Sequence, residues 1–246
     1  TKPSLVFGVA ALLLLIPVGY ALLFGFGPIP ELGAAGLGYA TAIVMWLEFI
    51  AFAVYLHRSR HFRDLALLSR FEWPEFKPIK QLLLLGVPMG IAIFMEGSLF
   101  VATALLIGRL GAVDVAAHQI ALNVASASFM IPLGVALATT VRVGHAVGAR
   151  DYPAVRWAMK AGLFLVLITQ TLSALMLAFA GHWISSWYTD DAAIAGLAGT
   201  LMIYAAIFQY PDGIQALSGG ALRGLKDTKI PMFITVFAYW AVGLSA

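Results

Sequence analysis

The feature that most constrains this chain is a series of long stretches without any charged side chain. Three of them, 3–30, 115–141 and 161–189, contain no Asp, Glu, Lys or Arg and are long enough to cross a bilayer. A fourth, 230–246, is of marginal length. Because lipid offers no hydrogen-bond partners to backbone groups, such stretches cross membranes as helices. The sequence therefore predicts an all-α integral membrane protein.

Three more apolar stretches of spanning length each contain one acidic residue, which is Glu48, Glu96 or Asp212. Together with the charge-free stretches, they predict about seven transmembrane helices. The expected spans are 5–24, 37–55, 82–107, 115–141, 162–180, 193–222 and a last one that begins at residue 230.

The overall composition supports a membrane protein and excludes other classes. With 61% hydrophobic and 11% charged residues, the chain has more apolar surface than a soluble domain of 246 residues could bury. It has no cysteine, so we expect neither disulfides nor a thiolate metal site. The net charge of +3 comes from basic residues in the links between spans. We therefore expect the lipid bilayer as a partner, no nucleic-acid partner and no cofactor.

The Lys and Arg residues are divided unevenly between the two sides of the predicted bundle. Thirteen of the 15 lie in three alternate links, 58–80, 142–160 and 223–229. Lys2 falls on the same side by alternation, and only Arg109 falls on the other. Because positively charged loops stay in the cytoplasm, the three links are predicted to be cytoplasmic and the protein to be a multi-pass plasma-membrane protein.

The basic link 58–80 is the predicted domain boundary. Residues 1–57 would then supply the last two helices of one bundle, and residues 81–246 the first five of another. Apolar residues inside the link predict a short amphipathic helix at the membrane surface; they are Leu65, Leu67, Leu68 and Phe71. Because both ends of the chain lie close to apolar spans, we expect it to be a piece of a longer polypeptide.

Two of the acids lie deep in their predicted spans. Asp212 precedes Arg223 by eleven residues, which is about 16 Å along a helix and about half the hydrocarbon thickness of a bilayer. Glu96 is thirteen residues from Arg109, so it is also deep. Carboxylates at that depth are rare without a function, and both are candidate site residues. The alternative is a structural hydrogen bond to a neighbouring helix.

Aromatic residues and a proline accompany these acids. Phe208 shares a helix face with Asp212, and Phe100 shares one with Glu96. An aromatic ring beside each acid suits a cationic, apolar ligand, although ordinary aromatic packing would give the same pattern. Pro211 should kink its helix and free a backbone carbonyl beside the second acid.

Five segments carry specific patterns: GPIPELGAAGLGYATA (27–42), GVPMGIAIFMEGSLF (86–100), AAHQIALNV (116–124), MIPLGVALATTVRVGHAVGA (130–149) and FQYPDGIQALSGGALRGLKDTKIPM (208–232). They resemble the MATE family (multidrug and toxic compound extrusion), in particular its NorM-like bacterial branch. The resemblance extends along the whole chain in order, and its most specific parts are RVGxxxGA and DxxQxxxxGxLRGxKDT.

The resemblance implies a twelve-helix antiporter with two lobes, of which this chain would supply helices 5–11. Residues 1–57 would be the last two helices of the N-terminal lobe, 58–80 the inter-lobe linker and 81–246 a C-terminal lobe without its final helix. Family members are not enzymes. They export cationic amphipathic compounds in exchange for Na+ or H+, and we expect a bacterial inner-membrane protein that is monomeric at full length.

The resemblance also carries site residues over to this chain. Those for cation or drug binding are Glu96, Asp212, Phe100, Gln119, Asn123 and Phe208, and those for the outer mouth are Asp190 and Asp191. A Na+ would bind at the first two. The family often has Tyr where this chain has Phe208, which removes one oxygen from a Na+ shell, so the choice between Na+ and H+ stays open. For Gln119 and Asn123 the alternative is hydrogen bonding between helices.

Two other functions are compatible with an architecture of this kind. A flippase for lipid-linked oligosaccharides would need several cationic residues inside the spans to hold pyrophosphate, and this sequence has none there. An intramembrane aspartyl protease could use Glu96 and Asp212 as paired acids that share a proton. The sequence YPDG matches neither of the signatures of such enzymes. A wide, open cavity around the two acids would favour transport, and a directly touching pair would favour proteolysis.

Overall fold

The computed structural model describes residues 2–25, 31–59 and 75–243, and every regular element within these ranges is a helix. Six of the helices are long and apolar enough to cross a membrane, and a shorter apolar helix covers Lys229–Gly243. The seven predicted spans are therefore all helical, the last of them shorter than the rest. The helices are α1 (Lys2–Phe24), α2 (Ala34–Arg58), α4 (Phe76–Ile107), α5 (Ala112–Gly148), α6 (Tyr152–Ser185), α7 (Ala192–Gly224), α8 (Lys229–Val236) and the π-helix η1 (Phe237–Gly243).

Most helices extend beyond the predicted spans. Helix α6 begins ten residues before the predicted start at residue 162, and α4 begins at Phe76 instead of residue 82. Absence of charge marks only the part of a helix that suits lipid, and a helix can begin earlier, in the polar region before it. For α6 the start is set by a capping side chain. The Asp151 carboxylate accepts a hydrogen bond from the backbone NH of Ala154 at 3.0 Å, which fixes the start of α6. The surface helix predicted around Leu65 lies outside the described residues.

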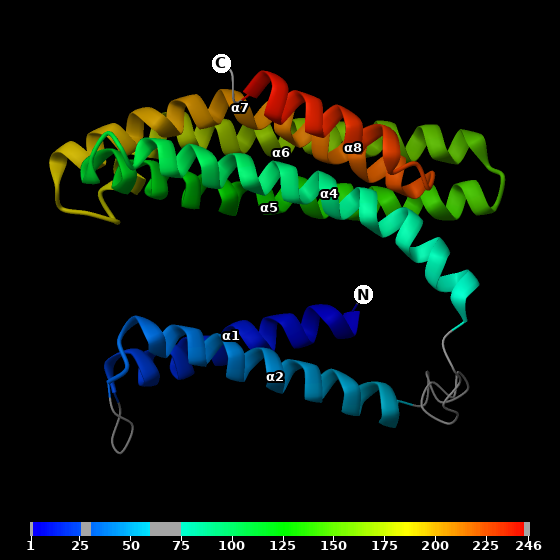
Figure 1. The fold of residues 1–246 in the computed structure, drawn as a ribbon, viewed down its shortest axis with the longest axis horizontal. Helices are drawn as coiled ribbons and strands as arrows, with labels where there is room; N and C mark the ends of the chain where they lie inside the picture. The colour runs from blue at the N-terminus through cyan, green and yellow to red at the C-terminus, as the bar shows by residue number, and fades with distance from the viewer. Residues whose placement is uncertain (1, 26–30, 60–74, 244–246) are drawn as a thin grey trace. The chain divides into compact units, whose positions relative to one another are not determined.

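The chain divides into two compact units, Thr1–Pro74 and Glu75–Ala246. In the first unit, α1 and α2 form an antiparallel hairpin (Figure 1). Gly36 permits the close approach, because a Cβ at this position would collide with the backbone of Leu22. Near the other end, the ring of Phe7 packs edge-on against Phe52 and Tyr55, with ring centroids 5.4 and 5.6 Å apart.

The second unit is built on α5, α6 and α7, which pack against one another (Figure 1). Small residues let α5 and α7 approach closely. A Cβ on Gly220 would lie 2.6 Å from the backbone oxygen of Ala136, and the Thr140 hydroxyl donates a hydrogen bond of 2.7 Å to the Gly220 carbonyl. The buried apolar core lies between the three helices and consists of Ala121, Val124, Ala174, Leu177, Met202 and Ala206.

Helix α4 packs mainly against α8 and η1 and only slightly against α5. The indole NH of Trp240 in η1 reaches α4, where it lies 3.4 Å from the Met95 carbonyl oxygen and 3.3 Å from the Ser98 hydroxyl. Large apolar side chains cover much of the outer surface of this unit, as expected for helices that contact lipid. The long apolar helices and these exposed apolar surfaces are what a multi-pass membrane protein requires.

The turns after α5 and α7 share a short pattern, Gly-x-Arg-Asp at 148–151 and Gly-x-Lys-Asp at 224–227. In each, the basic residue has a left-handed backbone, with φ 58° at Arg150 and 62° at Lys226. The following Asp donates its NH five residues back along the helix. Its carboxylate then accepts a hydrogen bond from an amide of the next helix. The pattern thus ends one helix and starts the next, and both turns lie at the same end of the unit (Figure 1).

Candidate functional site

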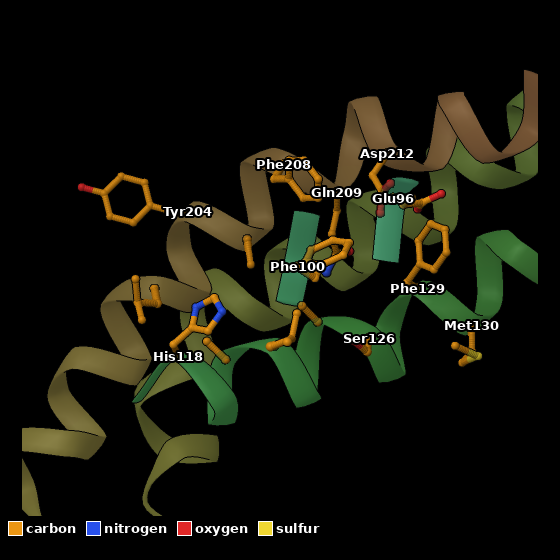
Figure 2. A pocket seen from close by; sticks show the side chains of 15 residues that line it. Glu96, Phe100, His118, Ser126, Phe129, Met130, Tyr204, Phe208, Gln209 and Asp212 are labelled. Atoms are coloured by element: carbon orange, nitrogen blue, oxygen red, sulfur yellow. The ribbon is translucent and has the colours of Figure 1, made fainter. Parts of the chain in front are cut away.

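A cavity of about 340 Å³ lies between α4, α5 and α7 in the second unit. Its size is within the range of small-molecule sites. Most of the lining is apolar or aromatic, and Glu96 and Asp212 are the only acids among the described residues that line it. The side chains that line it are shown in Figure 2: Glu96, Phe100, His118, Ala121, Leu122, Ala125, Ser126, Phe129, Met130, Leu201, Tyr204, Ala205, Phe208, Gln209 and Asp212.

The structure brings Glu96 and Asp212 together, although they are 116 residues apart in sequence. Glu96 comes from α4 and Asp212 from α7, and Figure 2 shows both carboxyl groups at the same end of the cavity. Both side chains are half-buried. The two carboxyl groups interact electrostatically with each other, and the guanidinium group of Arg223 acts on Glu96. The pair therefore places two acidic groups close together inside a largely apolar cavity.

Phe100 and Phe208 also line the cavity, as the helix periodicity predicts. Phe208 lies one turn before Asp212 on α7, and Phe100 lies one turn after Glu96 on α4. Phe129 of α5 adds a third ring close to the acids (Figure 2). Aromatic rings near carboxylates form an environment that suits an organic cation.

The π-helix η1 adds polar groups that sequence analysis missed. The Tyr239 hydroxyl hydrogen-bonds the side chain of Gln215 on α7, at 2.9 Å from its nitrogen and 3.2 Å from its oxygen. Tyr239 also interacts electrostatically with Glu96 and Asp212. Gln215 shares a face of α7 with Asp212 because the two are three residues apart. That spacing is a signal in the sequence, whereas the approach of Tyr239 depends on how η1 packs.

Gln119 and Asn123 do not line this cavity. Both lie on an exposed face of α5, and the Asn123 side-chain oxygen accepts a hydrogen bond of 2.9 Å from the Tyr188 hydroxyl. Asp190 is exposed in the α6–α7 link, and the Asp191 carboxylate caps α7 by accepting the NH of Ala193 at 2.8 Å. Binding by the first two and an outer-mouth role for the acids stay predictions.

A second feature missed in the sequence holds α7 next to Asp212. The side-chain amide of Gln170 on α6 donates a hydrogen bond of 2.6 Å to the backbone oxygen of Gln209. It reaches that oxygen only because Gly213 has no side chain, since a Cβ there would lie 2.6 Å from the Gln170 nitrogen. Helix α7 continues through Pro211 at this level. The sequence did carry a signal for this contact, because Gln170 is a polar residue in the middle of the charge-free stretch 161–189.

Among residues 2–25, 31–59 and 75–243, no three or more His, Asp or Glu side chains are grouped in a way that could hold a metal ion. Any cation at Glu96 and Asp212 would therefore need neutral oxygens to complete its shell.

Comparison with known proteins identifies the family. The family model described as MatE matches residues 88–245, which include both cavity acids. The chain belongs to the MATE family. It is 55% identical over 244 residues to the probable multidrug resistance protein NorM of Xanthomonas axonopodis pv. citri, covering 99% of this chain and 53% of that relative. It is 41% identical to the multidrug resistance protein PmpM of Pseudomonas aeruginosa, covering 99% of this chain and 51% of the relative.

The fold agrees with that of solved MATE proteins. The crystal structure of the eukaryotic MATE transporter AtDTX14 superimposes with a TM-score of 0.85 at 20% identity, covering 98% of this chain and 53% of that one. The predicted family and the all-helical membrane fold are thus confirmed. The chain spans about half the length of the curated relatives that it matches.

Proposed function

We propose that this chain forms the ion- and drug-binding part of a cation-coupled multidrug antiporter that exports cationic amphipathic compounds. The observation that carries the proposal is the cavity in which two facing acids, Glu96 and Asp212, are surrounded by aromatic and aliphatic side chains. An organic cation requires negative charge and apolar contact in one place, and this cavity provides both. The names of its relatives, which describe multidrug resistance proteins, support the same function.

Exchange follows from competition for the two carboxylates. A proton neutralises a carboxylate, whereas Na+ or a cationic drug binds to its charged form. Because these two are the only acids that the described residues bring to the cavity, an ion and a drug that both need them are expected to displace each other. The free energy stored in the ion gradient can then drive export of the drug if the cavity opens alternately to the two sides of the membrane.

The identity of the coupling ion depends on neutral oxygens near the acids. Phe208 supplies none, so a Na+ shell would need backbone carbonyl groups or water in addition to Glu96 and Asp212. The NorM-like resemblance favours Na+ slightly over H+. The described residues that line the cavity include no Lys or Arg, which supports export of cations over transport of an anionic lipid pyrophosphate.

A chimaera provides the test, because the chain covers half of its relatives. Residues 1–246 would replace the matching half of the Xanthomonas axonopodis relative, and efflux of a cationic dye would be measured in vesicles under an imposed Na+ or H+ gradient. We expect gradient-driven efflux in the parent chimaera, no such efflux in Asp212→Asn and strongly impaired efflux in Glu96→Gln. Phe208→Tyr, which adds an oxygen, should increase the dependence on Na+.

Glu75→Gln is the matched control for Glu96→Gln, because it makes the same change at an acid that is exposed and outside the cavity. It should leave efflux close to the parent rate. Full gradient-driven transport by a well-inserted Asp212→Asn chimaera would refute the proposed role of this carboxylate. Residues 1–246 alone should export no dye, because alternating access needs two lobes that move around a central site.

A further inference from the structure

Three buried, uncharged polar side chains lie on α6 and α7 next to the cavity. They are Gln170 and Ser173 of α6 and Gln209 of α7. Gln170 is 0% exposed, Gln209 2% and Ser173 9%. Within the described part of the chain, four of their side-chain atoms have no hydrogen-bond partner: Gln170 Oε1, Ser173 Oγ, Gln209 Nε2 and Gln209 Oε1. Buried polar atoms without partners are rare in proteins and call for a bound group that satisfies them.

The geometry connects this group with the cavity. Gln170 is joined to the backbone of Gln209 by the hydrogen bond of 2.6 Å across Gly213. Ser173 lies on the same face of α6 as Gln170, because the two are three residues apart. Gln209 also lines the cavity, and it precedes Asp212 by three residues on α7. The unpartnered atoms of Gln170 and Gln209 therefore lie next to the turn of α7 that carries the acid.

The chemistry of the unpartnered atoms identifies the bound group. Gln209 presents both a donor and an acceptor, and exchanging the nitrogen and oxygen of its amide leaves one of each. A bare cation would satisfy only acceptors and would be repelled by the amide NH. A drug-sized molecule needs more space than side chains of 0–9% exposure leave. Water both donates and accepts, and it is the usual occupant of such sites.

We propose that Gln170, Ser173 and Gln209 form a buried water site that opens through Gln209 into the cavity of Glu96 and Asp212. Water held there would border the Asp212 side of the cavity and exchange with water that enters the cavity. The inference concerns hydration of the folded chain, so it stands or falls independently of the transport activity.

Cysteine labelling tests the proposal directly, because the chain contains no cysteine and any introduced thiol is the only one. Ser173→Cys places a thiol in the polar group. Ala174→Cys is the matched control: it is the next residue of α6 and equally buried, at 8% exposure, but it lies in the apolar core. Both variants of the full chain, inserted in vesicles, would be treated with methyl methanethiosulfonate, whose transferred group is very small. Ala192→Cys, at the exposed first residue of α7, gives the rate for a freely accessible thiol.

We expect Ser173→Cys to react at least about tenfold faster than Ala174→Cys, because the reactive thiolate forms only where water is present. Adding Gln209→Leu should slow the reaction of Ser173→Cys, because the opening into the cavity is then apolar. Equal rates for Ser173→Cys and Ala174→Cys would overturn the proposal.

A second measurement decides the question if Ser173→Cys does not insert. Ser173→Ala keeps the backbone and nearly the same volume, so it should fold. If the site holds water, this variant loses a hydrogen bond and its unfolding temperature falls. If the site is dry, the variant loses an unsatisfied hydroxyl group and its unfolding temperature rises, which would contradict the proposal.

Discussion

The close contact between α5 and α7 leaves no room for a side chain at Gly220 but leaves room for one at its neighbour Gly219. A Cβ on Gly220 would lie 2.6 Å from the Ala136 backbone oxygen, whereas a Cβ on Gly219 would meet nothing within 4 Å. To relieve the first contact, the two helices would have to separate by roughly half an ångström or more. Such a shift would also weaken the hydrogen bond of 2.7 Å from Thr140 to the Gly220 carbonyl.

Relative to Gly219→Ala, which gains the same helix propensity, Gly220→Ala is therefore expected to lower the free energy of unfolding by about 2–4 kcal/mol. Overpacking of a close contact costs about 1–3 kcal/mol, and the weakened hydrogen bond adds about 1 kcal/mol. For a chain of this size, the unfolding temperature should then fall by roughly 4–16 °C. Gly219→Ala should be neutral or stabilising by up to about 1 kcal/mol, since alanine favours helix.

Thermal unfolding of the purified chain in one detergent, followed by helical circular dichroism, measures both variants under the same conditions. Because the two substitutions add the same methyl group at adjacent positions, differences in composition or in detergent binding cancel. Equal unfolding temperatures for Gly220→Ala and Gly219→Ala would refute the close approach of α5 and α7 on which the calculation rests.

Three further predictions concern other parts of the chain. A cysteine at Lys229 should react only with thiol reagents that reach the cytoplasm, and one at Ala192 with an impermeant external reagent; the reverse labelling would overturn the predicted orientation. Tyr239→Phe removes the hydrogen bonds to Gln215 and should lower the free energy of unfolding by about 1 kcal/mol in denaturation measurements, whereas an unchanged value would show that η1 is not held there. Arg150→Gly relieves a left-handed backbone with φ 58° and should raise the free energy of unfolding by up to about 1 kcal/mol, seen as a higher unfolding temperature; a lower temperature would contradict the turn geometry.

Some of the site could be predicted because it depends on one helix at a time. The depth of Glu96 and of Asp212 follows from their distance to the nearest basic residues. The placement of Phe100 and Phe208 on the same faces follows from helical periodicity, and both line the cavity with the acids. Gln119 and Asn123 also share a face, but periodicity alone does not say which way that face turns, and in the structure it is exposed.

Groups that meet from different helices were missed for the same reason. Tyr239 and Gln215 are 24 residues apart, and Gln170 and Gln209 are 39 apart, so no spacing rule relates them. Their contacts depend on how η1 and α6 pack against α7. The water site between α6 and α7 likewise exists only because Gly213 allows a glutamine to approach the next helix.

The sequence by itself determined the membrane class, the seven helical segments, the family and the two acids of the site, because each is a property of one continuous stretch of chain. Lipid excludes unpaired backbone groups and isolated charges, so length and charge alone indicate where the chain crosses the membrane. Only the tertiary structure decided which helices surround the cavity and which side chains meet in it. Apolar side chains face both lipid and neighbouring helices in this chain, so hydrophobicity did not mark the buried face; small residues and interhelical hydrogen bonds set the packing.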